Sequence, residues 1–163
     1  MESLWAPWRM AYVENAWLSS SCIFCETAST QQDEKNFILY RGQSVFILMN
    51  LYPYNPGHVM IAPYRHVDDL NKLTAAEQLE LIQEAARSTS LLRQTMNPDG
   101  FNLGMNQGKA AGAGVEDHLH LHIVPRWNGD TNFMPIVAAT KVIPEELAAT
   151  HRKLAPIFRE TQK

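Results

Sequence analysis

The chain has 163 residues, 45% of them apolar, and a formal net charge of -3. Such a chain can bury one good core but hardly two, so we expect a single domain over residues 1–163. Its acidic and basic residues are interspersed, which excludes the positive field that would hold nucleic acid. No segment approaches the roughly 20 apolar residues of a membrane span or has the form of a signal peptide. We therefore expect a cytoplasmic protein without membrane contact.

The N-terminal part contains three of the four tryptophans and both cysteines. Residues 1–20 form an aromatic extension, and clustered tryptophans more often cover a core edge or subunit contact than stack on a base. Cys22 and Cys25 follow in a CxxC knuckle over residues 21–26. This spacing suits either a redox dithiol or half of a tetrahedral zinc site. Residues 28–35 are polar and predict a loop.

The next segment predicts three strands. Residues 37–40 and 44–49 are short β-branched and aromatic runs on either side of Arg41-Gly42-Gln43, which indicates a hairpin. Residues 50–57 hold two prolines and two asparagines, so they predict a loop before a strand over 58–62.

Two helices are expected in the rest of the chain. A capping box at Thr74 and Glu77 precedes apolar residues at helical spacing and predicts a helix over 75–95; those residues are Leu79, Leu81, Ile82, Ala85, Ala86, Leu91, Leu92 and Met96. Turn residues end it before a strand over 101–105, and Pro144 with two acidic residues predicts a C-terminal helix over 144–158. The predicted class is α+β: an antiparallel sheet of about five strands, one long central helix and a C-terminal helix.

Three of the six histidines lie in one five-residue window, as His118, His120 and His122. In a strand, this period of two places the three imidazoles on one face, with Leu119, Leu121 and Ile123 in the core. The row could bind a metal with water at an open position, or its middle imidazole could be a nucleophile oriented by its neighbours. The small residues of 109–114 favour the second, because their backbone N–H groups can approach a phosphate closely.

The chain resembles the histidine triad superfamily. His118-Leu-His-Leu-His-Ile-Val124 is similar to the triad signature, and Asn55-Pro-Gly-His-Val-Met-Ile-Ala-Pro63 to the strand-loop-strand upstream of it. The resemblance covers residues 22 to 136, with the family core over 37–136. Residues 5–9, 50–58 and 125–133 look like the branch that contains bacterial diadenosine tetraphosphate phosphorylases.

That resemblance implies a homodimeric enzyme in which His120 attacks the α-phosphorus of a dinucleoside polyphosphate or related nucleotide. Water or inorganic phosphate would then release the nucleotidyl group from the histidine. His122 would contact the phosphate or leaving group, and His58 would support the triad. A neutral imidazole can attack without first losing a proton. Its Nδ1–H then needs a fixed acceptor, which we expect to be a backbone carbonyl in the glycine-rich loop of residues 109–114. The base would be adenine or guanine, and the substrate can carry magnesium.

Further contacts are implied only at matching positions. Asn50 would bind ribose hydroxyls, and Asn106 would lie near the bridging or leaving phosphate. Relatives often have Gln, Ser or Thr just before the triad, whereas this chain has Ala113 and Gly114. Backbone amides at Gly112 and Gly114 would therefore take the place of side-chain contacts.

Zinc-bearing relatives imply a separate metal site. They join the CxxC to a histidine after the Pro-Gly-His strand and to the first triad histidine, here Cys22, Cys25, His66 and His118. Four such ligands make a closed structural zinc site, and reduced free thiols are the alternative.

Two other functions stay open. A nucleotide-binding regulatory protein with little turnover would need no nucleophile at His120. A zinc hydrolase using all three triad histidines is disfavoured, because the CxxC offers a separate site for a metal. Arg126 either contacts a phosphate or forms a surface ion pair, and His151 is expected to be solvated.

Overall fold

The computed structural model describes residues 21–131 and 143–160. The predicted aromatic extension, residues 1–20, and the end of the predicted core, residues 132–136, lie outside the described residues. In the described part, no helix is both long enough and apolar enough to cross a membrane.

Five strands form one antiparallel sheet in the order β1-β2-β3-β5-β4. The strands are β1 (Ile38–Arg41), β2 (Val45–Met49), β3 (Val59–Pro63), β4 (Gly100–Met105) and β5 (Leu121–Arg126). β1 and β2 form the predicted hairpin. The expected α+β class and five-stranded antiparallel sheet are confirmed.

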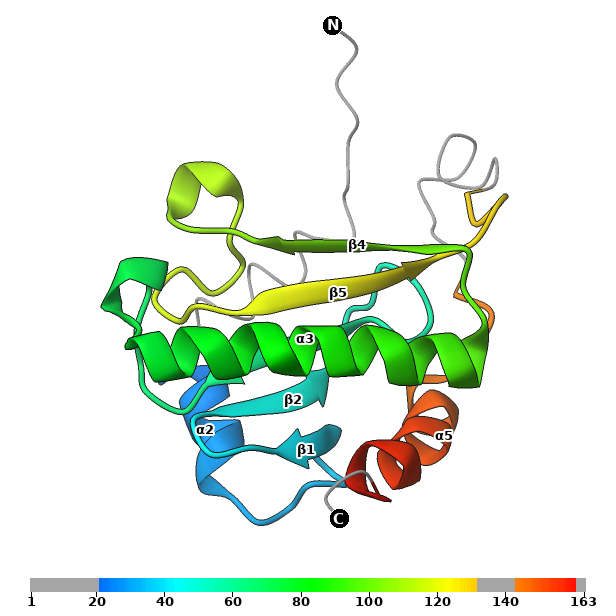
Figure 1. Ribbon diagram of the computed structural model, residues 1–163, viewed down its shortest axis with the longest axis horizontal. Coiled ribbons are helices and arrows are strands. Elements are labelled where there is room, and N and C mark those ends of the chain that lie inside the picture. Colours follow the sequence, from blue (N-terminus) through cyan, green and yellow to red (C-terminus); the bar gives the residue numbers. More distant parts are fainter. Residues whose placement is uncertain (1–20, 132–142, 161–163) are drawn as a thin grey trace, which may run out of the picture.

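The long helix α3 (Ala75–Met96) lies across one face of the sheet, and α5 (Leu147–Glu160) packs beside β1 (Figure 1). The predicted capping box is present: the Thr74 hydroxyl accepts from the Glu77 N–H, and the Glu77 carboxylate accepts from the Thr74 N–H. These bonds satisfy donors that a helix start otherwise leaves unpaired.

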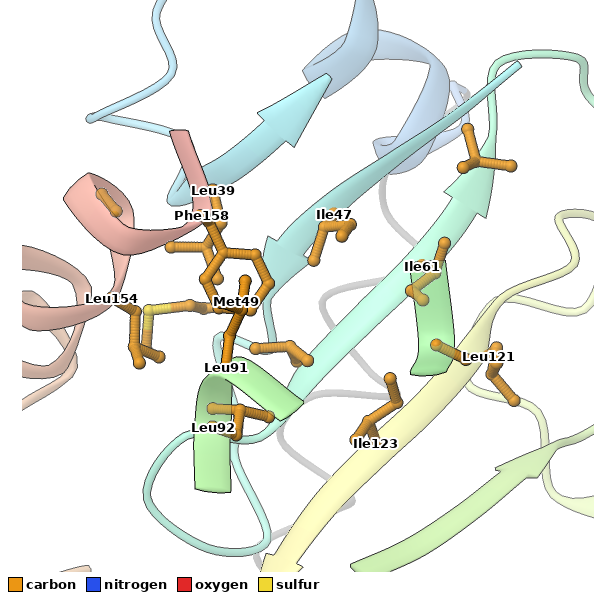
Figure 2. Packing of buried hydrophobic residues seen from close by; sticks show 14 of the residues in the cluster. Leu39, Ile47, Met49, Ile61, Leu91, Leu92, Leu121, Ile123, Leu154 and Phe158 are labelled. Carbon is orange, nitrogen blue, oxygen red and sulfur yellow. The ribbon is translucent and has the colours of Figure 1, made fainter. Parts of the chain in front are cut away.

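The main core fills the space between this face of the sheet, α3 and α5 (Figure 2). Alternate residues of the strands enter it, including Ile47, Ile61, Leu121 and Ile123. The opposite face carries a second apolar cluster of Phe24, Ile38, Phe46, Leu48, Met60 and Ala62. Because side chains alternate along β5, His122 also belongs to that second face, and His120, just before the strand, contacts Phe24 there.

Three of the apolar residues predicted for α3 do not face the core. Leu79 and Ile82 are each 58% exposed and Ala86 is exposed too, whereas Leu81 is fully buried. The expectation that all the apolar positions of this helix continue one buried stripe was therefore wrong here. The stripe that packs on the sheet is narrower and follows Leu81, Ala85 and Leu92.

The C-terminal helix begins at Leu147, three residues later than predicted, and ends at Glu160. Glu146 is its cap, because its carbonyl accepts the Thr150 N–H, and Glu145 pairs with Lys153 instead of lying in the first turn. The solvated position expected for His151 was also wrong. His151 is 6% exposed, and its Nε2 lies 3.3 Å from the Ile38 carbonyl oxygen.

A short helix, α2 (Ile23–Ser29), takes the place of the expected knuckle and the start of the expected loop over 28–35. The Cys22 carbonyl accepts the Glu26 N–H at 3.0 Å, so the CxxC forms the first turn of this helix. Cys22 is the N-cap residue and Cys25 lies within the helix.

Candidate active site

The histidine row is only partly in a strand. β5 begins at Leu121, so His118 and His120 lie in the extended segment before it, and His122 is within it. The strand ladder does not extend to residue 119, because the Leu119 N–H donates to the carbonyl of Val67, in a loop, and not to a neighbouring strand. The predicted sorting of faces still holds: Leu121 and Ile123 belong to the main core and Leu119 to a smaller apolar cluster, whereas His118 and His120 contact Phe24 of the opposite face.

His120 is held by one well-defined hydrogen bond. Its Nδ1 lies 2.8 Å from the His118 carbonyl oxygen, which can only accept, so Nδ1 carries the proton and donates. The expected acceptor in the glycine-rich loop was wrong, although it is a backbone carbonyl as predicted. In the neutral ring, Nε2 then keeps its lone pair. Burial lowers the pKa of His120, partly offset by this hydrogen bond, so the neutral form is favoured at pH 7.

His58 and His122 form a second hydrogen-bonded unit. The Tyr54 backbone N–H donates to His58 Nδ1 at 3.0 Å, and His58 Nε2 lies 3.0 Å from His122 Nδ1. Because the backbone N–H can only donate, Nδ1 of neutral His58 accepts and its proton lies on Nε2. The His58 Nε2–H therefore donates a hydrogen bond to His122 Nδ1. The proton of neutral His122 is then on Nε2. The His120 and His122 rings are 4.7 Å apart.

Two cavities lie near these rings. One, of about 370 Å³, is lined by α2, the end of β2 and the following loop, including Ile23, Phe24, Asn50 and Met60. The other, of about 400 Å³, is lined by His122 and Asn106 among others. His120 itself lines neither cavity, but its ring contacts one residue of each: Phe24 at 4.8 Å and His122 at 4.7 Å between ring centroids.

The CxxC and two histidines form a separate cluster. The ligand atoms of Cys22, Cys25, His66 and His118 all lie within 4.8 Å of one another. The Cys22 and Cys25 sulfurs are 3.2 and 3.6 Å from His118 Nδ1, and Cys25 Sγ is 3.4 Å from His66 Nδ1. Tetrahedral zinc with ordinary bond lengths separates sulfur and nitrogen ligands by about 3.6 Å. The cluster therefore has nearly the size that zinc requires.

A hydrogen bond prepares His118 for this site. Its Nε2 lies 2.9 Å from the Pro63 carbonyl oxygen, so Nε2 donates and Nδ1 presents a lone pair to the cysteines. His118 is 1% exposed. Burial, helped by the neighbouring Cys22 sulfur, raises the pKa of the Cys25 thiol, which a bound cation would reverse.

Comparisons with known proteins agree with this arrangement. A family model described as the HIT domain matches residues 31–129. An AP-4-A phosphorylase of Mycobacterium tuberculosis is 40% identical over 163 aligned positions, which cover 95% of this chain and 83% of the relative. The chain belongs to the histidine triad (HIT) family.

Other HIT proteins extend the comparison. A bis(5'-adenosyl)-triphosphatase of Dictyostelium discoideum is 34% identical over 131 positions, covering 77% of this chain and 87% of the relative. The structure of a zinc-bound HIT protein from Mycobacterium smegmatis has a TM-score of 0.68 at 24% identity, covering 86% of this chain and 95% of that one. That likeness supports the shared fold. Since both curated relatives are enzymes by name and are aligned over most of their length, this chain is an enzyme of the HIT family.

The predicted nucleotide contacts are distributed over both cavities. Asn50 lines the cavity beside Phe24; its amide oxygen accepts the Tyr52 N–H, and its amide nitrogen lies 3.5 Å from His58 Nε2. Asn106 lines the cavity beside His122, and its amide nitrogen lies 3.5 Å from the Gly112 carbonyl oxygen. Gly112 ends the short 3-10 helix η2 (Lys109–Ala111), and Gly114 follows in the same turn region.

Arg126 forms an ion pair with Asp130 and also lines the cavity beside His122. Its guanidinium donates to both carboxylate oxygens of Asp130 and to the Asn102 side chain. Asp130 also accepts from Asn55, whose amide donates to the Pro125 carbonyl as well. This network ties the loop that contains Tyr54 to the end of β5.

Phe24 and Tyr54 are parts of the site that the residue patterns did not predict. Phe24 lies between the two cysteines, and the CxxC motif specifies only the cysteines. Tyr54 contributes a backbone N–H, which no residue pattern reveals, and its ring packs 4.8 Å from that of His58. Only the fold brings these groups to the triad.

Proposed function

We propose that this HIT enzyme transfers a nucleotidyl group from a dinucleoside polyphosphate to Nε2 of His120 and then to water or inorganic phosphate. The names of the two curated relatives support this substrate class, since one is an AP-4-A phosphorylase and the other a bis(5'-adenosyl)-triphosphatase. The observation that carries the proposal is the 2.8 Å contact between His120 Nδ1 and the His118 carbonyl, which leaves Nε2 as a fixed nucleophile.

In the first step, the Nε2 lone pair attacks the α-phosphorus and the bond to the bridging oxygen breaks. The leaving nucleotide takes the electron pair of that bond, and the Nε2–H of His122 donates to the departing oxygen. In the second step, water or inorganic phosphate attacks the same phosphorus, and the bond from phosphorus to His120 breaks. The released product is a nucleoside monophosphate with water and a nucleoside diphosphate with phosphate.

The two cavities suit the two halves of such a substrate. The cavity beside Phe24 combines apolar side chains, such as Ile23 and Met60, with polar ones and has a size within the range of small-molecule sites, so we assign it to the nucleoside that becomes attached to His120. Asn50 at this cavity would bind the ribose hydroxyls. The cavity beside His122 would hold the leaving group, with Asn106 and the amides of Gly112 and Gly114 near its phosphates.

We assign the cluster of Cys22, Cys25, His66 and His118 to structural zinc. Four ligands of this type close the coordination sphere, and a zinc ion there would crosslink α2 to the segment before β5 without entering the reaction. Among the described residues, the cluster includes neither His120 nor His122. This separation disfavours a zinc hydrolase that uses the whole triad.

The oligomeric state, location, magnesium and domain extent remain predictions made from the sequence. A homodimer has support from β4, which in the described part of the sheet is an edge strand and exposes half of Leu103. Cytoplasmic location, magnesium on the substrate, and one domain over residues 1–163 are proposed on the sequence alone.

The test uses diadenosine tetraphosphate with ¹⁸O-labelled inorganic phosphate, followed by mass analysis of the nucleotides. A phosphorylase releases ADP whose β-phosphate carries the label, and a hydrolase releases unlabelled AMP. The His120→Ala variant, as control, releases neither. If the wild-type protein binds AMP but releases no product either with or without inorganic phosphate, the regulatory-binding alternative replaces this proposal.

A further inference from the structure

The short helix α2 belongs to both the metal cluster and the nucleotide cavity. Cys22 and Cys25 supply two of the four candidate metal ligands, and Ile23 and Phe24, between them, line the cavity assigned to the nucleoside. Two binding sites therefore share one turn of backbone.

Phe24 is the residue of this turn that contacts both sites. Its side chain is buried, and its ring centroid lies 5.1 Å from that of His118 and 4.8 Å from that of His120. His118 is a candidate metal ligand, and His120 is the candidate nucleophile. A change in the position of Phe24 would change contacts in the metal cluster and in the nucleotide site together.

α2 cannot hold this position by itself. It has seven residues and no side-chain hydrogen bond at its N-cap, and isolated helices of this length are not stable in water. Its position depends on the packing of Phe24 with Phe46, Leu48 and Met60, on a hydrogen bond from Arg41 to the Ala28 carbonyl at the C-terminal end of the helix, and on the contacts of its two cysteines at the N-terminal end. A metal bound by both cysteines would therefore order the turn that forms the cavity wall.

We propose that metal binding at the CxxC cluster and nucleotide binding in the adjacent cavity are thermodynamically coupled, with Phe24 as the positioning residue that carries the coupling. The proposal rests on the proposed function, because it takes zinc and a nucleoside as the two ligands. Each ligand orders α2, so the second to bind loses less conformational entropy. Reciprocity requires that AMP raise zinc affinity by the same factor by which zinc raises AMP affinity.

The coupling is measured by titrating zinc against a competing chelator, with no AMP and with saturating AMP, in the full chain. We expect AMP to strengthen zinc binding by roughly fivefold or more, the lower end of typical coupling between sites. The apo and zinc-loaded proteins should show the same ratio in AMP affinity. Because these are binding measurements, they do not depend on turnover.

Three variants test the role of Phe24. Phe24→Leu keeps an apolar side chain but loses the ring against both histidines. In this variant, saturating AMP should therefore leave zinc affinity almost unchanged, a factor of about one. Ile23→Ala shortens another side chain of the same cavity wall and should weaken AMP binding but keep the coupling. Phe46→Leu changes a fully buried ring of the same cluster that lies beside Tyr64, and it should lower Tm while the coupling stays.

The outcomes separate this inference from the proposed function. If AMP fails to bind the wild-type protein, the proposed nucleotidyl transfer fails and the coupling with it. If zinc fails to bind, the zinc assignment and the coupling fail, while the nucleotidyl transfer stands. If both bind but AMP leaves zinc affinity unchanged, the coupling is overturned while the proposed function stands. Coupling that persists in Phe24→Leu overturns the role of Phe24. Should that variant fail to fold, the wild-type ratio still decides whether the coupling exists.

Discussion

The carbonyl oxygen of His118 lies 2.8 Å from Nδ1 of His120, while the imidazole of His118 lies 3.2 Å from the Cys22 sulfur. One residue thus contributes its side chain to the metal cluster and its backbone to the candidate nucleophile. The two triad neighbours have different surroundings as a result: His118 is oriented by Pro63 and the cysteines, and His122 by His58.

Removing His58 should slow the reaction more than it weakens binding. The His58→Ala variant leaves His122 Nδ1 without its donor, so His122 no longer presents Nε2–H in a fixed direction. We expect kcat to fall by roughly 10²-fold, the lower end of the effect of a positioned proton donor, with little change in the Kd for AMP. His151→Ala is the control, since it removes another buried histidine far along the chain and should lower Tm without this loss of kcat.

The histidine row shows how far the sequence predicts the site. Its period of two sorts the side chains between the two faces correctly, because alternation is a local property of extended backbone. The hydrogen bonds of the site depend instead on residues brought together by the sheet, such as Tyr54 with His58 and His58 with His122. The acceptor for His120 is the carbonyl only two residues before it, so its assignment to residues 109–114 was wrong for another reason: β5 begins after His120, which leaves the His118 carbonyl outside the strand ladder and able to accept from the imidazole.

In the fold, too, features set by neighbouring residues were predicted and features set by distant residues were not. The capping box at Thr74 and the hairpin at Arg41-Gly42-Gln43 involve neighbouring residues, and both are present. The burial of His151 depends on a carbonyl 113 positions away, at Ile38, and could not be read from the polar residues beside it. Likewise, the exposure of Leu79 and Ile82 depends on which side of α3 packs on the sheet, which helical spacing alone does not encode.

Substitution of a metal ligand should remove the metal and reduce stability. Cys25→Ser and His66→Ala each leave three of the four ligands, so we expect zinc content by mass spectrometry to fall well below one per chain and Tm to decrease. His122→Ala should keep its zinc, because His122 is outside the cluster. Loss of zinc from His122→Ala would instead favour a metal site built on the triad.

Asn50 should distinguish ribose from deoxyribose. If its amide binds the sugar hydroxyls, Asn50→Ala should weaken AMP binding by roughly tenfold, the value of one or two hydrogen bonds. The same variant should bind 2'-deoxy-AMP about as well as the wild-type protein does. Calorimetric titration of both nucleotides with both proteins makes this comparison, and an equal loss for the two nucleotides would contradict a ribose contact.

Glu77 should make stability depend on pH in the acid range. Hydrogen bonds from Arg65, and then from Thr74, lower the pKa of its buried carboxyl from 4.5 to about 2. The folded state therefore favours the carboxylate, and its contribution to stability is present above pH 4.5 and lost as pH falls toward 2. Urea unfolding across this range should show a shallower decrease for Arg65→Gln, and an unchanged slope would contradict this origin.

The most direct test of the central claim is the intact mass of the protein quenched during turnover of diadenosine tetraphosphate. The account predicts an adduct of one nucleotidyl group on the wild-type chain, mapped by peptide analysis to His120 and absent from His120→Ala. An adduct on another residue, or equal turnover by His120→Ala, would contradict the assignment of His120 as the nucleophile.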